Sequence, residues 1–123
     1  MRLAGVRRQL EEARAALVES AGHAAESRYD PAYRMALKSR NLLFHATRGV
    51  AAARGEELPE MPVTGAGATG SLDDHVAALG ALDAALAVDD DLTLGPLLDA
   101  AARPYARYLG WLRAEVGRAM RPI

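Results

Sequence analysis

Apolar residues recur at alternating three- and four-residue steps along most of the chain, which is the spacing of one face of an α-helix. The first helix is expected to end before Arg28-Tyr29. Asp30 and Pro31 then supply an N-cap and a first helical residue for a second helix, which runs to about Arg54. The apolar positions are Leu3, Val6, Leu10, Ala13, Leu17 and Ala24 in the first helix, and Tyr33, Ala36, Leu37, Leu43, Phe44, Val50 and Ala51 in the second.

The periodicity disappears after Gly55, a typical residue to follow a helix end, and returns at Ser71. The segment between them, GEELPEMPVTGAGATG, contains two prolines and four glycines, so we predict a flexible loop over residues 55–71. Neither half of the chain has enough apolar residues to bury a core alone. We therefore expect one domain over residues 1–123.

Two further helices are predicted after the loop. Ser71 can cap the third helix, with acidic residues 73–74 in its first turn, and the acidic run 89–91 predicts a turn before the fourth. Pro104 removes one hydrogen bond from the fourth helix, so we expect a kink or a brief break near Arg103. The apolar positions are Leu72, Val76, Leu79, Leu82 and Leu86 in the third helix, and Leu97, Leu98, Ala101, Tyr105, Tyr108, Leu109, Leu112, Val116 and Met120 in the fourth.

Together these elements predict an all-α fold, an up-and-down four-helix bundle with one long loop. Half of the residues are apolar but only 5% are aromatic, which favours closely packed helices over a sheet. The absence of Cys excludes thiol catalysis, disulfides and Cys-ligated metal. Lys+Arg number 15 against 16 Asp+Glu, so any basic surface has to be local.

The opening residues, MRLAGVRRQLEEARA, contain no apolar run of signal-peptide length, and no later segment approaches a membrane span. We expect a cytoplasmic protein with no membrane partner. His23 and His75 lack the Glu-x-x-His repeat of carboxylate-bridged di-metal bundles, and no strand precedes the loop glycines. We therefore expect no metal site and no cofactor.

Five polar residues on the second helix form the main candidate binding site. They are Arg34, Lys38, Asn41, His45 and Arg48, spaced by four, three, four and three residues. This spacing places them on one stripe, opposite much of the apolar face. One interpretation is an ordinary solvated surface. The other is a contact site for phosphate or nucleic acid, because its cations align with no carboxylate among them.

The segment RNLLFH, residues 40–45, sets an arginine and a histidine five positions apart. A guanidinium binds phosphate and an imidazole is a general acid/base near neutral pH, so the pair suits phosphodiester chemistry. On an uninterrupted helix, however, residues five apart point about 140° away from each other. Arg40 falls towards the apolar face, where we expect it to pair with a carboxylate such as Asp83 or Glu19, or to lie at an interface.

The stretch YDPAYRMALKSRNLLFHATRGVAAARGEELP, followed by a loop and SLDDHVAALGAL, resembles the helix–loop–helix arrangement of HEPN domains. The resemblance covers roughly residues 27–86. In HEPN ribonucleases an Arg-x4-His motif acts on RNA without metal, with two protomers pooling their residues across a dimer interface. The resemblance therefore implies Arg40, Asn41 and His45 as catalytic residues. HEPN toxins paired with a nucleotidyltransferase antitoxin carry Tyr two positions after the His, whereas this chain has Thr47.

From these features we expect a non-catalytic, HEPN-like binding module that forms a homodimer. It would engage a protein, nucleotide or nucleic-acid partner through the stripe on the second helix. One alternative is a metal-independent ribonuclease toxin of a bacterial toxin–antitoxin pair. Another is a purely structural dimer. We expect Arg40 and Trp111 at the dimer interface, because Ala-rich stripes bury little area and Trp111 lies off the main apolar stripe of its helix.

Overall fold

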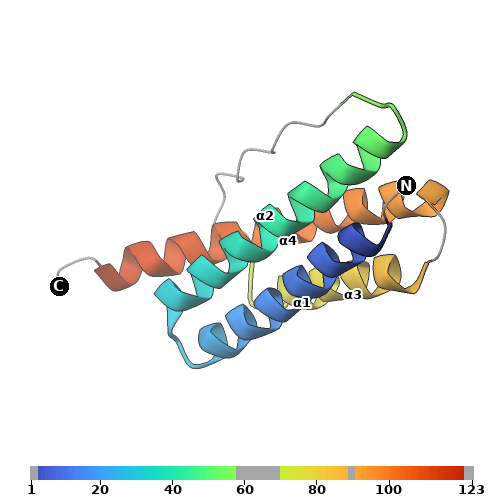
Figure 1. The fold of residues 1–123 in the computed structure, drawn as a ribbon. Coiled ribbons are helices and arrows are strands. Elements are labelled where there is room, and N and C mark those ends of the chain that lie inside the picture. Colours follow the sequence, from blue (N-terminus) through green and yellow to red (C-terminus); the bar gives the residue numbers. More distant parts are fainter. Residues whose placement is uncertain (1–2, 58–69, 89–90, 121–123) are drawn as a thin grey trace.

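The computed structural model describes residues 3–57, 70–88 and 91–120, and all regular structure in them is helical. The helices are α1 (Leu3–Ala25), α2 (Tyr29–Ala53), α3 (Asp74–Ala87) and α4 (Asp91–Met120) (Figure 1). The predicted all-α bundle of four helices is confirmed. Within these ranges no helix combines the length and apolar character needed to cross a membrane.

The helices pack as two hairpins, α1 with α2 and α3 with α4, and the hairpins meet where α2 packs on α4 and α1 on α3 (Figure 1). Residue pairs between the hairpins show that both of these contacts are antiparallel. It follows that α2 and α3 run in the same direction, at opposite corners of the bundle. The pairs are Arg14–Asp83 and Arg7–Leu86 between α1 and α3, and Tyr29–Trp111 and Ser39–Tyr105 between α2 and α4.

The predicted up-and-down order is therefore wrong for the step from α2 to α3, because these two helices run in the same direction. Arg54, just after α2, lies beside Gly95, whereas α3 begins at Asp74, which pairs with Arg107. These two positions on α4 are about 18 Å apart along its axis. The long connection between α2 and α3 is thus a crossover between opposite ends of the bundle. Helical periodicity does not distinguish the two orders, because a loop of this length permits either.

Both helices of the first hairpin end in Schellman motifs, in which a residue just past the helix takes a left-handed conformation. Gly55 has φ +70°, as its position in the sequence predicted, and Ser27 has φ +60°. Serine gives no signal for this conformation, so the sequence did not indicate the second motif. The defining hydrogen bonds run from Glu56 N–H to Ala51 O and from Arg28 N–H to His23 O, each 2.9 Å.

The start of α3 lies three residues later than predicted. Residues 71–74 form a tight turn before it, and the Asp74 carboxylate accepts a hydrogen bond of 2.7 Å from the Ser71 N–H. The same carboxylate receives the Nε–H of Arg107 at 3.1 Å. Gly70 lies so close to α4 that a Cβ would overlap the Arg107 carbonyl oxygen. This close contact, together with the ion pair, fixes the position of α3 on α4.

Helix α4 is continuous through both of its prolines, Pro96 and Pro104, so the brief break considered near Arg103 is absent. Helix α4 packs along its length on α2 and α3. Of the acidic run 89–91, Asp91 begins the helix, and the other two residues lie outside the described ranges, as do most residues of the predicted loop.

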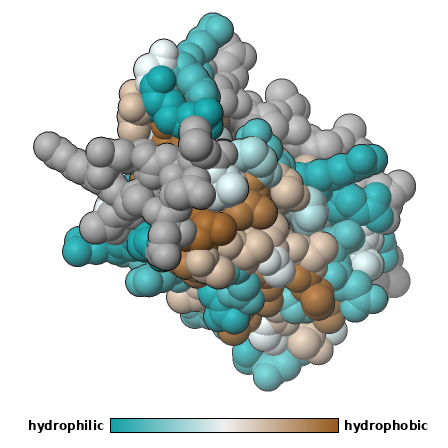
Figure 2. Space-filling model, turned by 90° about the vertical axis from the view of Figure 1, so that its right-hand side faces the viewer, coloured by the Kyte–Doolittle hydropathy of each residue, from teal (hydrophilic) through white to brown (hydrophobic). Residues whose placement is uncertain are grey.

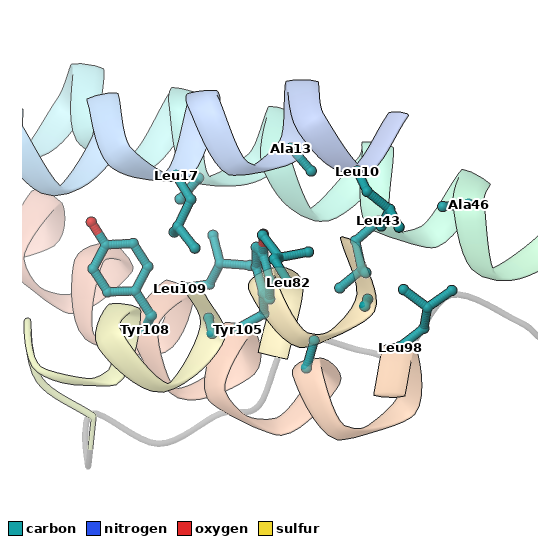
Figure 3. Close-up of a cluster of buried hydrophobic side chains, with 14 of the residues drawn as sticks. Leu10, Ala13, Leu17, Leu43, Ala46, Leu82, Leu98, Tyr105, Tyr108 and Leu109 are labelled. Atoms are coloured by element: carbon teal, nitrogen blue, oxygen red, sulfur yellow. The ribbon is translucent and has the colours of Figure 1, made fainter. Parts of the chain in front are cut away.

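The side chains buried between α1 and α2 are mostly small, whereas those buried towards α3 and α4 are mostly large (Figure 3). On α2 the predicted stripe is partly wrong: Tyr33 and Leu37 pack at the edge of the core, and Phe44 is half-buried outside it. The inner positions are taken by smaller residues because α1 approaches closely. Buried small residues are Ala13, Ala16, Ala24, Ala32, Ala36, Ser39 and Ala46; buried large ones include Leu10, Leu17, Leu82, Leu98, Tyr105, Tyr108, Leu109 and Leu112.

Two fully buried serines connect α1, α2 and α4 through hydrogen bonds. Ser39 Oγ donates to the Ala13 carbonyl oxygen of α1 at 2.6 Å, and Tyr105 OH lies 2.6 Å from the same Oγ. A carbonyl oxygen only accepts, so the serine proton is committed to it and the tyrosine must donate to the serine. Ser20 of α1 makes the same contacts in the opposite direction. Its Oγ donates to the Ala32 carbonyl oxygen of α2 and accepts from Tyr108 OH.

Burial shifts the proton equilibrium of both tyrosines. Desolvation raises the pKa of Tyr105 far above its usual value of 10.0, and the hydrogen bond with Ser39 offsets only part of the shift. The pKa of Tyr108 is raised for the same reason, with Ser20 giving the smaller, opposite effect. Both phenols thus remain neutral donors in the folded protein at any ordinary pH.

Substitutions in the Ser39–Tyr105 pair are expected to have unequal effects. Tyr105→Phe removes one donor and should lower the free energy of unfolding by about 1 kcal/mol. Ser39→Ala leaves a buried phenol without an acceptor and should cost about 1–3 kcal/mol. The double variant should cost less than the sum, because the phenol is then gone as well. Urea unfolding of the four proteins measures this, and additive effects would contradict the pairing.

Stability is expected to fall in alkaline solution. Above pH 10 the tyrosines of the unfolded chain lose their protons while the buried pair stays neutral, so the unfolded state is increasingly favoured. The contribution of these two groups is complete below pH 10 and is lost as the pH rises above it. Urea unfolding across this range should show the decline. Tyr105→Phe should make it shallower, and an unchanged slope would disprove the role of this phenol.

Candidate functional site

The five stripe residues lie together on the outward face of α2, as predicted. Arg34, Lys38, Asn41, His45 and Arg48 are all exposed. The buried residues of α2 occupy the opposite face, against α1 and α4. Because α2 is uninterrupted from Tyr29 to Ala53, its regular geometry holds the stripe in line. The stripe is about 21 Å long from its first to its last residue.

The charge along the stripe is uneven. Arg34 Nη2 lies 3.1 Å from the Asp30 carboxylate, which is one turn before the stripe begins, so the charge of Arg34 is paired. Within the described residues no carboxylate forms an ion pair with Lys38 or Arg48. The Arg48 guanidinium lies over the Phe44 ring, 5.6 Å from its centroid, which restricts the side chain without neutralising it. The available positive charge therefore lies on the stripe from Lys38 to Arg48.

Arg40 lies on the flank of α2 and not on the stripe. It is half-buried, on the same side of the helix as Tyr33 and Leu37, and its Nη2 is 3.5 Å from Asn41 Oδ1. The sequence suggested Asp83 or Glu19 as its partner, and both suggestions are wrong.

The two carboxylates are engaged elsewhere. Asp83 accepts the Nε–H of Arg14 at 2.6 Å, and Glu19 lies 3.9 Å from His23 on α1. Asp83 belongs to α3, which is at the opposite corner of the bundle from α2. The expectation failed because it assumed that these helices were neighbours.

The Arg40–His45 pair does not form a common site within one chain. The two residues are on a continuous helix, where five positions separate them by about 140° around the axis and about 7.5 Å along it. Arg40 is half-buried on the flank, whereas His45 is exposed on the stripe with Asn41. Cleavage chemistry by this motif would require a second chain to complete the site.

Trp111 covers an edge of the bundle and is half-buried, so the expectation of an exposed indole at an interface is not supported. Its ring meets the Tyr29 ring edge-on, with 5.8 Å between the two centroids. It stacks on the Tyr108 ring at an interplanar angle of 30°, with 6.1 Å between centroids. The ring centroid of His75, at the start of α3, lies 6.0 Å from that of Tyr108. This aromatic group joins three helices, and its members are too far apart in the sequence for a pattern to reveal it.

In the described part of the chain no three His, Asp or Glu side chains converge in an arrangement that could hold a metal ion. Comparison with known proteins finds no match for the chain among family models, curated proteins or solved structures.

Substitution of Arg40 and His45 distinguishes a structural role from a catalytic one. Arg40→Ala should lower the free energy of unfolding by about 1 kcal/mol, because the half-buried stem packs on the flank of α2. His45→Ala should change it by less than about 0.5 kcal/mol, since the imidazole is exposed. Thermal melts measure both effects.

The same proteins should leave RNA intact. If instead the parent protein cleaved RNA, and both substitutions abolished cleavage without moving the melting temperature, the ribonuclease alternative would be correct. A parallel incubation without protein controls for spontaneous hydrolysis.

Proposed function

We propose that this chain is a non-catalytic, HEPN-like helical binding module that acts as a homodimer and engages nucleic acid through the α2 stripe. The observation that carries the proposal is the alignment of Lys38, His45 and Arg48 on one exposed face. Asn41 lies between them as a hydrogen-bonding group. The only carboxylate on this line, Asp30, is at the far end, where it pairs with Arg34.

The spacing of these groups favours an extended anion over a small one. Lys38 and Arg48 are about 15 Å apart along the helix axis, too far for both to reach one phosphate. A chain of phosphates can meet both cations at once. The chain as a whole has a net charge of −1, so attraction to a polyanion would come from this face and not from a general field.

Backbone contacts of this kind carry little sequence information. The half-buried Phe44 ring is covered by the Arg48 guanidinium, and the rings of Tyr29, Tyr108 and Trp111 are packed on one another. Binding is thus expected to depend on charge more than on base identity. It should be weak and sensitive to salt.

The non-catalytic assignment follows from where the motif residues lie. A general acid and a phosphate-binding group have to converge on one scissile bond. Arg40 and His45 diverge within one chain, and Asn41 lies with His45 on the exposed stripe, so only a dimer that brings two α2 helices together could join them in one site. Asn41 and His45 are therefore proposed to contact the nucleic acid, and Arg40 to stabilise the fold.

Binding to a short single-stranded RNA tests the proposal. Lys38→Ala combined with Arg48→Ala should weaken binding, because two cations that face the phosphates are removed. The plot of log affinity against log salt should become shallower by about 0.7 for each phosphate that the variant no longer neutralises. Fluorescence anisotropy over a salt series measures both quantities.

Arg103→Ala is the matched control, because Arg103 is also exposed but lies on α4. It should leave affinity and slope unchanged. Equal weakening by the control and the double variant would show that general charge drives binding, and an absence of RNA binding by the parent protein would reject the proposal.

A further inference from the structure

The chain has three histidines, and His45 is the one that lies on the α2 stripe. Its side chain is exposed, with Asn41 one turn before it and Arg48 about one turn after it. The imidazole is the side chain whose ordinary change of charge falls between about pH 5 and pH 8. Lysine and arginine remain cationic throughout that range. Among the residues of the stripe, His45 is therefore the one whose charge varies near neutral pH.

The place of His45 along the stripe matters because the available cations are far apart. Lys38 and Arg48 are separated by about 15 Å along the helix axis, and no cation lies between them on the stripe while the imidazole is neutral. A protonated His45 would lie about 10.5 Å from Lys38 and about 4.5 Å from Arg48 along the same axis. An extended polyanion would then meet three cations in line instead of two.

The neighbours of His45 on α2 couple its proton to a bound phosphate. Arg48 lies three residues away on the same face, where like charges repel each other. A phosphate between the two side chains would remove that repulsion, because it attracts both. The Phe44 ring is tilted beside the imidazole, with 6.4 Å between the two centroids, and supplies no charge. The imidazolium is therefore favoured more in the bound state than in the free protein.

Charged groups of both signs face this part of α2 from α1. The contact of Gly49 with Val6 places His45 level with about residue 10 of the antiparallel α1. Arg7 turns towards α3, where it donates to the Leu86 carbonyl oxygen. In the described residues no carboxylate forms an ion pair with His45. The other charged residues at this level of α1 are all exposed: Arg8, Glu11 and Glu12.

The charges on α4 at this level are also balanced. The bond between Tyr105 and Ser39 places His45 level with about residue 99 of the antiparallel α4. The charged residues within about one turn of that position are Asp99 and Arg103, both exposed. Apolar side chains gather instead at the end of the bundle where α1 and α4 begin (Figure 2), and apolar groups do not titrate. The charge that a polyanion meets at this point of the stripe is thus decided by the imidazole itself.

We propose that protonation of His45 regulates nucleic-acid binding by the α2 stripe, with affinity rising as the pH falls from about 8 to about 5.5. This inference rests on the proposed function and adds its regulation. The sign follows from linkage, because a polyanion that binds the protonated form better also holds the proton more tightly. The additional affinity is present in mildly acidic solution and is lost as the pH rises through the range in which an imidazole titrates. Phosphodiester groups stay charged across this range, so the change belongs to the protein.

Two substitutions fix the charge of this position in opposite ways. His45→Gln keeps it polar and neutral, whereas His45→Arg keeps it cationic. Fluorescence anisotropy with the same short single-stranded RNA, at the two ends of the pH range, compares them with the parent protein. In acid the parent should bind about two- to fivefold more tightly, the gain expected of one exposed ion pair. Its salt slope should steepen by about 0.7. Neither variant should show this response, and His45→Arg should bind more tightly than His45→Gln.

His23→Gln is the matched control, because His23 lies on α1 and outside the stripe. It should keep the pH response of the parent protein. A parent affinity that does not change with pH, or a response that survives in either His45 variant, would overturn this inference and leave the binding site itself standing. Absence of RNA binding at both pH values would reject the proposed function and this inference together. Circular dichroism should show equal helix content at both pH values, so that a change in affinity is not a change in folding.

Discussion

The packing of this bundle depends on two buried serines that hydrogen-bond to the backbone of the neighbouring helix. A serine hydroxyl reaches a carbonyl on another helix only when the two backbones lie close together. Ser20 and Ser39 make this contact in opposite directions between α1 and α2, at 2.6 Å each. The seam between these helices is accordingly lined by alanine, because larger side chains would separate the backbones.

The same two hydroxyls determine what α4 has to provide. Once each serine has donated its proton to a carbonyl, its oxygen still accepts, and a buried acceptor needs a donor. Tyr105 and Tyr108 lie about one turn apart on the same face of α4. They supply both donors and fill the space that the alanines leave. The small residues of the first hairpin and the tyrosines of the second therefore depend on each other. The orientation of α2, and hence the outward direction of its stripe, follows from it.

Much of the local structure was predictable because its causes are local. Helix periodicity, the glycine after α2 and the exposed line from Arg34 to Arg48 depend on residues within a few turns of each other. The parallel course of α2 and α3 depends instead on which hairpin faces pack, and apolar patterns do not record that choice. The mistaken partners of Arg40 follow from the same cause, since Asp83 lies on the helix that does not adjoin α2.

Other features were missed because the residue type gave the wrong signal. Ser20 and Ser39 are polar, and a pattern based on hydropathy assigns such residues to the surface, although both are fully buried. Trp111 lies off the apolar stripe of α4, yet it is half-buried through contacts with Tyr29 and Tyr108. These positions depend on partners elsewhere in the chain.

The crossover between the hairpins also bears on how the chain folds. Contacts within each hairpin join segments that are near in sequence, whereas the tyrosine–serine bonds close separations of 66 and 88 residues. Loop-closure entropy makes such distant contacts slow to form. Each hairpin is therefore placed to assemble early, with its polar groups hydrated. The tyrosine–serine bonds can form only when the two hairpins dock, so the bonds that specify the native arrangement are expected among the last contacts made.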